Sequence, residues 1–234
     1  MTADSTALPK YLQTAEMLIR EIAAGRLLDG ERLAPERDMA SELGIAVGTL
    51  RKALSDLEEK GLLERVHGSG NYVRYRPDAG GVYAFFRLEL IDGGGLPTAE
   101  VLALDLVAKP DDLPAFGASP AAHRIRRLRR LSGVTAALEE VWLDAARAPA
   151  LRPQDLSESL YLFYRQRLGL HIARAEDRVG VAPVPDWAPA GFPVAPGVPA
   201  GFVERRSMAA EGEVAEFSRT WFDFDKVRYV SRIR

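Results

Sequence analysis

The sequence of 234 residues contains no cysteine, only three histidines and no long apolar run, and each absence excludes a class of chemistry. Without cysteine the chain can form no disulfide, no thiolate metal site and no cysteine nucleophile. The histidines, at positions 67, 123 and 171, lack the H-x-x-x-H spacing of helical metal ligands, so the sequence predicts neither a metal site nor a cofactor. No stretch approaches about 18 consecutive apolar residues and no secretion signal is visible, so a cytoplasmic protein without a membrane partner is expected.

The length and composition are those of a chain with two domains. A hydrophobic content of 47% over 234 residues suffices for two cores. A run of helix and strand breakers from Arg76 to Gly81 separates two regions with regular apolar patterns. We therefore predict one domain over residues 1–76, a linker over 77–81 and a second domain over 82–234.

The first region predicts three helices followed by a hairpin. Apolar residues recur at helical spacing over 9–24, then at Met39, Ala40 and Leu43, then at Leu50, Ala53, Leu54 and Leu57. Gly44 lies where a short helix–turn–helix connection needs a residue free to leave helical geometry. Strand patterns at 62–66 and 71–75 flank Gly68, Ser69 and Gly70, and glycine supplies the positive dihedral angles of a hairpin turn. This order is the plan of a winged helix-turn-helix DNA reader, whose recognition helix here carries Thr49, Arg51 and Lys52.

The charge of this region favours DNA binding through its distribution alone. Residues 1–76 hold eleven Lys/Arg against twelve Asp/Glu, a net of −1. The basic groups nevertheless gather on the helix-turn-helix and the hairpin, at Arg37, Arg51, Lys52, Arg65, His67, Arg74 and Arg76. A charge cluster of this kind is often only a solvated face, but the surrounding motif favours DNA contacts. His67 has two interpretations, a polar residue beside the turn or a base contact.

Residues 11–76 resemble the N-terminal domain of GntR-type bacterial regulators. Motif positions of that family are held by Glu36-Arg37, Leu43-Gly44, Thr49, Arg51, Ala53-Leu54 and the Gly68-Ser69-Gly70 tip. The resemblance implies that Arg37, Thr49, Arg51 and the wing glycines Gly68 and Gly70 approach DNA. Ala46 and Val47 depart from the motif, because they replace a Ser-Arg pair that would cap the recognition helix and contact DNA.

The second region alternates extended and helical patterns. Strands are expected at residues 82–91, 100–108, 124–131, 136–143, 172–182, 202–209 and 215–222, and helices at 110–116 and 156–168. Six prolines between Pro183 and Pro199 predict an irregular loop. Strands with intermittent helices are typical of an α+β domain around one antiparallel sheet.

Residues 82–234 resemble the UTRA ligand-sensing domain of the HutC branch of GntR regulators, which has a chorismate-lyase-like fold. The motif positions are held by Arg127, Arg129, Glu139, Ser159, Tyr161, Glu216 and Phe222. Phe222 stands where the family has tyrosine, and Thr135 where it has proline. In relatives these positions line a cleft for a small metabolite, so the resemblance implies an effector-binding site at these residues.

The arginine pair of the second region has two interpretations. Strand alternation places Arg127 and Arg129 on one face, and burying two guanidinium groups requires anionic partners. Glu139 and Glu216 can be those partners in a purely internal network. Alternatively, at least one arginine binds a phosphate or carboxylate of a ligand in bidentate fashion. Ser159 is expected to cap a helix under either interpretation.

The sequence thus predicts a DNA-binding transcriptional regulator, a homodimeric repressor that binds a palindromic operator and responds to a small, anionic effector. Two alternatives remain, a DNA-binding dimer whose second domain is only structural, and an enzyme of the chorismate-lyase kind. The sequence offers no nucleophile–base pair, so no catalytic residue is assigned. The effector is expected to lower operator affinity by reorienting the two readers about the linker that follows Arg76.

Overall fold

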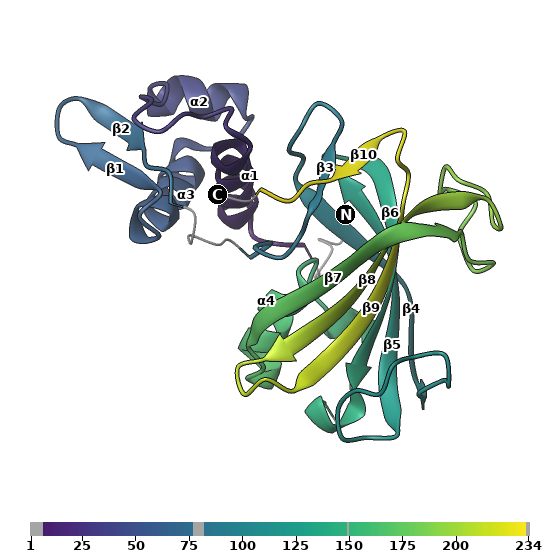
Figure 1. Ribbon diagram of the computed structural model, residues 1–234. Coiled ribbons are helices and arrows are strands. Elements are labelled where there is room, and N and C mark those ends of the chain that lie inside the picture. The colour runs from purple at the N-terminus through teal and green to yellow at the C-terminus, as the bar shows by residue number, and fades with distance from the viewer. Residues whose placement is uncertain (1–6, 77–81, 149, 233–234) are drawn as a thin grey trace. The chain divides into compact units, whose positions relative to one another are not determined.

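The structure is a computed structural model that describes residues 7–76, 82–148 and 150–232. It divides into two compact units (Figure 1). The reader unit comprises Leu8–Phe86 and Asp92–Leu96, and the sheet unit comprises Arg87–Ile91 and the chain from Pro97 onward. The chain therefore passes between the units after Phe86, after Ile91 and after Leu96. The predicted linker over 77–81 lies outside the described residues.

The reader unit contains the three predicted helices and the predicted hairpin. The helices are α1 (Lys10–Ala24), α2 (Glu36–Glu42) and α3 (Val47–Glu59), and the hairpin pairs β1 (Leu63–Val66) with β2 (Gly70–Val73). Gly25 ends α1 at a φ of 74°, and Gly44 turns the chain between α2 and α3 at a φ of 62°. Both positive values favour glycine, because a side chain there would strain the backbone.

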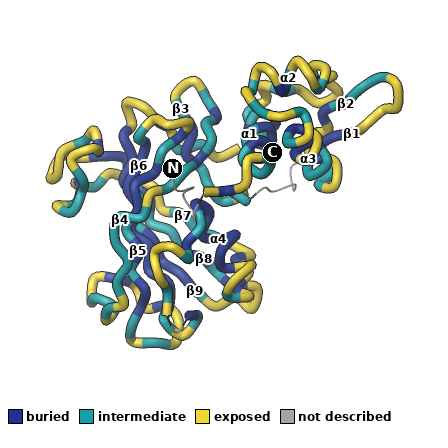
Figure 2. The backbone as a smooth tube through the Cα atoms, turned by 180° about the vertical axis from the view of Figure 1, so that it is seen from behind, coloured by how far each residue is buried: buried dark blue, intermediate teal, exposed yellow. Residues whose placement is uncertain are grey.

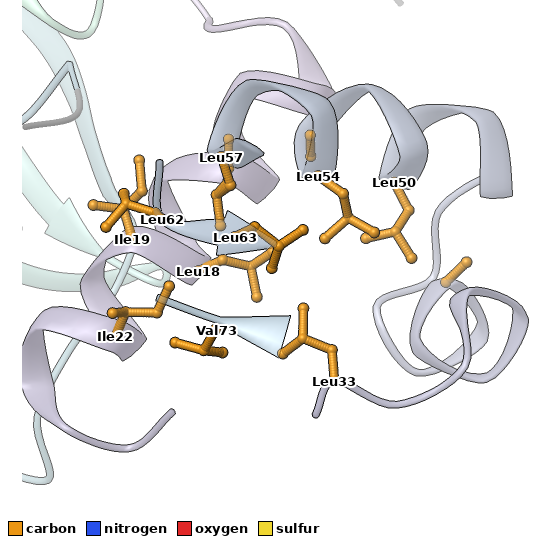
Figure 3. Packing of buried hydrophobic residues seen from close by; sticks show 13 residues of the cluster. Leu18, Ile19, Ile22, Leu33, Leu50, Leu54, Leu57, Leu62, Leu63 and Val73 are labelled. Atoms are coloured by element: carbon orange, nitrogen blue, oxygen red, sulfur yellow. The ribbon is translucent and has the colours of Figure 1, made fainter. Parts of the chain in front are cut away.

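One apolar core holds the reader unit together. Figure 3 shows that its side chains come from the helices, from the segment before α2 and from both strands of the hairpin. The labelled members are Leu18, Ile19, Ile22, Leu33, Leu50, Leu54, Leu57, Leu62, Leu63 and Val73. The predicted apolar stripe of α3 is buried completely, since none of its four members is more than 1% exposed. Burial of this stripe leaves the opposite side of α3 open to a partner.

The sheet unit is built on a six-stranded antiparallel sheet. Its strands are β4 (Pro97–Ala108), β5 (Ala121–Leu131), β6 (Val134–Asp144), β7 (Ile172–Pro183), β8 (Pro199–Ala209) and β9 (Val214–Phe222), in the order β4-β5-β6-β9-β8-β7. A separate two-stranded ribbon pairs β3 (Leu88–Leu90) with β10 (Val227–Tyr229). The α+β prediction with one antiparallel sheet is confirmed. In Figure 2 the inner strands β5 and β6 are largely buried, whereas the tip of the β1–β2 hairpin is exposed.

The two faces of the six-stranded sheet differ in what covers them. Leu128, Leu138 and Trp221 point to one face, where Val184 and Phe192 of the proline-rich loop pack on them; we call it the loop face. The other, the cluster face, carries the intervening residues of the same strands. The loop over 183–199 is irregular, as predicted, and it covers the face opposite the predicted effector residues.

Three predicted elements of the sheet unit are corrected. The strand expected over 82–91 forms only at β3, because the preceding Val82 N–H donates to the carboxylate of Glu16 in α1, at 2.7 Å. The helix expected over 110–116 is a single turn, since Pro114 has no N–H to continue it. The helix expected over 156–168 begins only at α4 (Leu160–Phe163) and continues as a π-helix over Tyr164–Leu168. Among the described residues, no helix is long and apolar enough to cross a membrane.

Candidate functional site

The first candidate site is a groove of about 550 Å³ between the hairpin and the helix-turn-helix. It is lined by Arg32, Leu33, Ala34, Pro35, Glu36, Arg51, Arg65 and the wing residues Val66–Asn71. Four of the predicted DNA-binding residues, Arg51, His67, Gly68 and Gly70, therefore meet around one depression. With Arg32 and Arg65 its rim carries three guanidinium groups against one carboxylate, a balance that attracts phosphate.

Arg51 is held at this groove by a single ion pair. Its Nε lies 2.6 Å from Oε2 of Glu36, the residue before Arg37 in α2, while the Arg51 side chain remains 65% exposed. An exposed pair of this kind contributes little to stability, so the guanidinium group is free to exchange its carboxylate partner for DNA.

The other predicted DNA-binding residues lie away from the groove. Arg37 is exposed in the first turn of α2, and Thr49 is half-buried in the first turn of α3. The ammonium group of Lys52 lies 4.0 Å from the ring centroid of Tyr11 in α1, so it points to a different side of α3 from Arg51.

The wing is shaped by two glycines, which the sequence analysis identified, and by one arginine, which it did not. Gly68 and Gly70 have φ values of 72° and 132°. The backbone of Arg32 bridges to Tyr72 of β2, and its Nε would lie 3.0 Å from a Cβ added at Gly70. Arg32 is therefore part of the wing base, although 40 positions separate it from Tyr72. The local sequence before α2 gives no sign of this pairing.

The second candidate site is a buried polar cluster on the cluster face of the sheet. Arg127 and Arg129 of β5 both bind Glu139 of β6, with N–O distances of 2.5 and 2.9 Å. Both guanidinium groups also donate to the backbone carbonyl of Glu158, at 3.2 and 3.0 Å. The two arginine side chains are only 4% and 5% exposed. The two guanidinium groups thus share the carboxylate of Glu139, and the other acceptor that both of them bind, the Glu158 carbonyl, is neutral.

The protonation equilibria of this group follow from burial and pairing. Burial alone would raise the pKa of Glu139, but Arg127 and Arg129 together lower it to about 2. Burial lowers the pKa of Arg127, an effect opposed by Glu139. Glu139 therefore stays ionised at neutral pH and serves as the carboxylate that both arginines bind.

Glu216 of β9 forms a second group on the same face, and its partners are hydroxyls. Tyr164 donates to Oε2 at 2.6 Å, while Tyr161 and Ser207 donate to Oε1 at 3.2 and 3.0 Å. Within the described part of the chain Glu216 forms no ion pair, and it is 2% exposed. Burial raises its pKa, although the hydrogen bonds from Tyr164 and Ser207 oppose the rise. Of the two carboxylates that the sequence left open as partners of the arginines, Glu139 therefore forms the ion pairs, while Glu216 binds Tyr164 and Ser207, which the sequence did not indicate.

The last two predicted effector residues have structural contacts. The Ser159 side chain accepts the N–H of Leu162 at 3.4 Å, so the predicted cap of α4 is confirmed, and this cap places the neighbouring Glu158 carbonyl against the arginines. Phe222 faces the cluster side of β9, but its ring lies directly over Gly201 of β8. Among the described residues, no group of three or more metal-binding side chains is present.

Comparison with known proteins identifies the class to which this combination of a winged reader and a sensing sheet belongs. The sequence pattern of the gntR family of bacterial regulatory proteins matches residues 10–73, and that of the UTRA domain matches residues 92–228. The chain belongs to the GntR family and carries a UTRA effector-binding domain. It is accordingly a DNA-binding transcriptional regulator.

Individual relatives agree with this assignment along nearly the whole chain. The chain is 62% identical to the HTH-type transcriptional regulator SmoD of Agrobacterium fabrum, over 97% of both sequences. It is 26% identical to the mannosyl-D-glycerate transport/metabolism system repressor MngR of Escherichia coli, over 94% of both. Among solved structures, the possible transcriptional regulator YydK of Bacillus subtilis shares the fold, with 20% identity, a TM-score of 0.54 and coverage of 97% of this chain and all of that one.

Proposed function

We propose that this regulator is a homodimeric repressor of a palindromic operator and that a small anion, bound on the cluster face of its UTRA domain, relieves repression. The observation that carries the anionic effector is the pair of buried guanidinium groups, of Arg127 and Arg129, that bind one carboxylate on the same face of the sheet. A phosphate or carboxylate is the kind of group that guanidinium groups bind through bidentate hydrogen bonds. Two relatives whose names include the word repressor, MngR and NagR, support the sign of the regulation.

The proposed DNA contacts combine base readout with phosphate binding. Arg51 and Thr49 on α3 and Arg37 on α2 would meet the major groove, while His67, Gly68 and Gly70 would meet the backbone or the adjacent minor groove. Lys52 remains a proposed phosphate contact, which requires its ammonium group to leave the ring of Tyr11. Dimerisation would place two such readers on successive grooves of a palindrome.

Titration calorimetry on the full chain tests the anionic effector. Because MngR is named for mannosyl-D-glycerate, a sugar carboxylate, that compound and its neutral counterpart mannosylglycerol form a matched pair of probes, and inorganic phosphate is a third. The proposal expects binding of at least one of the anions and none of mannosylglycerol. Binding of the neutral compound with equal affinity would contradict an anionic site.

A variant pair assigns that binding to the cluster. Arg129→Ala should abolish anion binding while Arg127 still pairs with Glu139, so that the fold persists. Arg126→Ala is the matched control, because Arg126 has its own ion pair with Glu140 at 2.8 Å and lies on the loop face. Unchanged anion affinity in Arg129→Ala would favour the second candidate, a sheet unit whose Arg–Glu network is purely structural. The binding of both arginines to Glu139 and to the Glu158 carbonyl is the observation that supports this candidate.

A further inference from the structure

A third set of polar side chains extends from the effector cluster to the ribbon formed by β3 and β10. Arg205 of β8 forms a bidentate ion pair with Asp177 of β7, with both N–O distances at 2.6 Å. The side chains of Arg205 and Asp177 are only 16% and 11% exposed. The guanidinium group of Arg205 also lies close to the hydroxyl of Tyr161, where it opposes the rise in the pKa of Tyr161 that burial causes. The hydroxyl of Tyr229 in β10 donates to the same Asp177 carboxylate at 2.7 Å.

These contacts form a continuous series from Tyr161 through Arg205 and Asp177 to Tyr229. Its first member touches Glu216 and Ser207, so it belongs to the effector cluster. Its last member belongs to a ribbon of two three-residue strands. None of the three residues beyond Tyr161 is needed to explain the cluster itself, and all of them come from positions that carry no motif of the UTRA domain quoted above.

The ribbon is a short structure that depends on its attachments. Backbone hydrogen bonds from Ile91 to Lys226 and from Val230 to Arg87 close it at 3.0 and 2.8 Å. Arg232 adds a bidentate ion pair to Glu89 of β3. An isolated two-stranded hairpin is marginally stable in water, so a side-chain contact such as that of the half-buried Tyr229 contributes to ordering the ribbon.

The ribbon also lies at the point where the chain leaves the reader unit. Arg87 directly follows Phe86, the last residue of the long reader segment. Phe86 is held within the reader unit by Arg20 of α1, whose guanidinium carbon lies 5.4 Å from the ring centroid of Phe86. A change in the ribbon therefore acts on a segment that is fixed to the first helix of the DNA reader.

We propose that Arg205, Asp177 and Tyr229 form a link that transmits the state of Tyr161 in the effector cluster to the β3–β10 ribbon, and through Arg87 to the reader unit. Arg205 acts here as a positioning residue. An anion that attracts the Tyr161 hydroxyl or the Arg205 guanidinium group loosens the pair with Asp177, and Asp177 then holds Tyr229 differently. The regulatory meaning of the link rests on the proposed effector function, whereas its existence is a property of the protein without effector.

Hydrogen–deuterium exchange on the full chain, without effector or DNA, tests the link directly. The variants are Tyr161→Phe, Tyr229→Phe and the double variant, and the readout is exchange in peptides that cover 87–91 and 226–230. Each single variant should raise exchange there about threefold or more, within the range of couplings in one hydrogen-bond network. The double variant should exchange no faster than the faster single variant, because either change alone cuts the link. Effects that multiply in the double variant, or no effect of Tyr161→Phe on the ribbon, would overturn the proposal.

Two further variants separate the link from a general loss of stability. Asp177→Asn should reproduce the effect of Tyr229→Phe and should add nothing to it. Asp105→Asn is the matched control, because Asp105 forms an ion pair with Arg124 at 2.8 Å between neighbouring strands on the loop face, and it should leave the ribbon unchanged. Exchange in β6 reports global unfolding. If it rises in Tyr161→Phe, the same single and double variants are measured with Arg205→Lys instead of Tyr161→Phe. Effects of Arg205→Lys and Tyr229→Phe that multiply in their double variant would again overturn the link. A failed anion titration would leave this result intact and refute only the effector function.

Discussion

The reader groove and the effector cluster use the same residue type in opposite ways. Arg51 at the groove is 65% exposed and binds the carboxylate of Glu36, whereas Arg127 and Arg129 are about 5% exposed and both bind Glu139 and the Glu158 carbonyl. An exposed guanidinium group keeps its hydration and its rotamer freedom until DNA arrives. A buried one has already lost both, so its geometry is fixed before a ligand binds. The comparison teaches that the DNA surface is adaptable, while the sensing face is preorganised and sensitive to small changes.

The largest effect should come from removing the shared carboxylate of the cluster. Glu139→Gln removes the charge of the carboxylate that both buried guanidinium groups bind, and breaking a buried ion pair in this way costs about 3–5 kcal/mol. Glu36→Gln removes the exposed partner of Arg51 and should cost at most about 1 kcal/mol. Urea unfolding of both variants measures the difference. Equal losses would show that the two regions do not differ as described.

A smaller effect should follow from crowding the same face of the sheet. Gly201 of β8 has no room for a Cβ, because an added methyl group would overlap the ring of Phe222. Gly201→Ala should therefore destabilise the protein by about 1–3 kcal/mol, the usual range for overpacking. Gly180→Ala in β7 is the control, since nothing lies within 4 Å of its Cβ position. Thermal unfolding should separate the two, and the double variant Gly201→Ala with Phe222→Leu should recover part of the loss; similar melting of both glycine variants would refute the contact.

The charge of Glu216 should show itself as a dependence of stability on pH. Burial raises the pKa of Glu216 in the folded protein, so the folded state holds this proton at pH values where the unfolded chain has released it. Stability is then lost as the pH rises from the ordinary glutamate range toward the folded pKa. Glu216→Gln cannot lose a proton and should be more stable than the parent by about 0.5–2 kcal/mol at pH 8, with no gain at pH 4. A gain of equal size at both pH values would contradict burial of the charge as its cause.

The smallest effect on stability should come from the reader groove, where the effect on DNA is large. Arg51→Ala should change the free energy of unfolding by no more than about 0.5 kcal/mol. Operator affinity should fall by about 1–3 kcal/mol if the guanidinium group reads a base. Arg74→Ala is the control, because Arg74 is also exposed, at 44%, and paired with Glu64 but lies outside the groove. Mobility-shift titrations on an operator selected from random duplexes measure the affinity of both variants. Equal losses of operator affinity in the two variants would show that Arg51 is only a non-specific contact.

The sequence predicted the features that depend on local patterns. The stripe of α3, the glycine between α2 and α3, and the cap at Ser159 all involve residues within a few positions of each other, and the structure confirms them. The strand-rich pattern also predicted each of the six sheet strands to within a few residues. The helix over 110–116 was predicted wrongly because its apolar spacing outweighed Pro114, whose missing N–H decides the local structure.

Side-chain contacts between neighbouring strands of the sheet could not be predicted from the sequence. Arg205 and Asp177 are 28 positions apart and meet only because β7 and β8 are paired in one register. Their sequences show ordinary alternation, which gives the face of each residue but not its neighbour. The same limit explains why the sequence left an arginine partner open for Glu216: the alternation of β9 gives the face of Glu216, but not that Tyr164 of the π-helix donates to its carboxylate. The distribution of charge on a sheet face follows from register, which a single sequence does not supply.

The buried carboxylate of Glu16 affects where the chain can be cut when the reader unit is transferred to another protein. It is 1% exposed, and it accepts backbone N–H groups of Val82 and Tyr83, beyond the last residue of the gntR match. A fragment cut at residue 76 would lose both hydrogen bonds, and a hydrogen bond to a charged group contributes about 1.5–3 kcal/mol. Asp92–Leu96, which the UTRA match includes, completes the same unit. In a chimeric regulator, exchange of the reader is therefore expected to succeed when the junction falls after Leu96 and to fail when it falls at the apparent end of the wing.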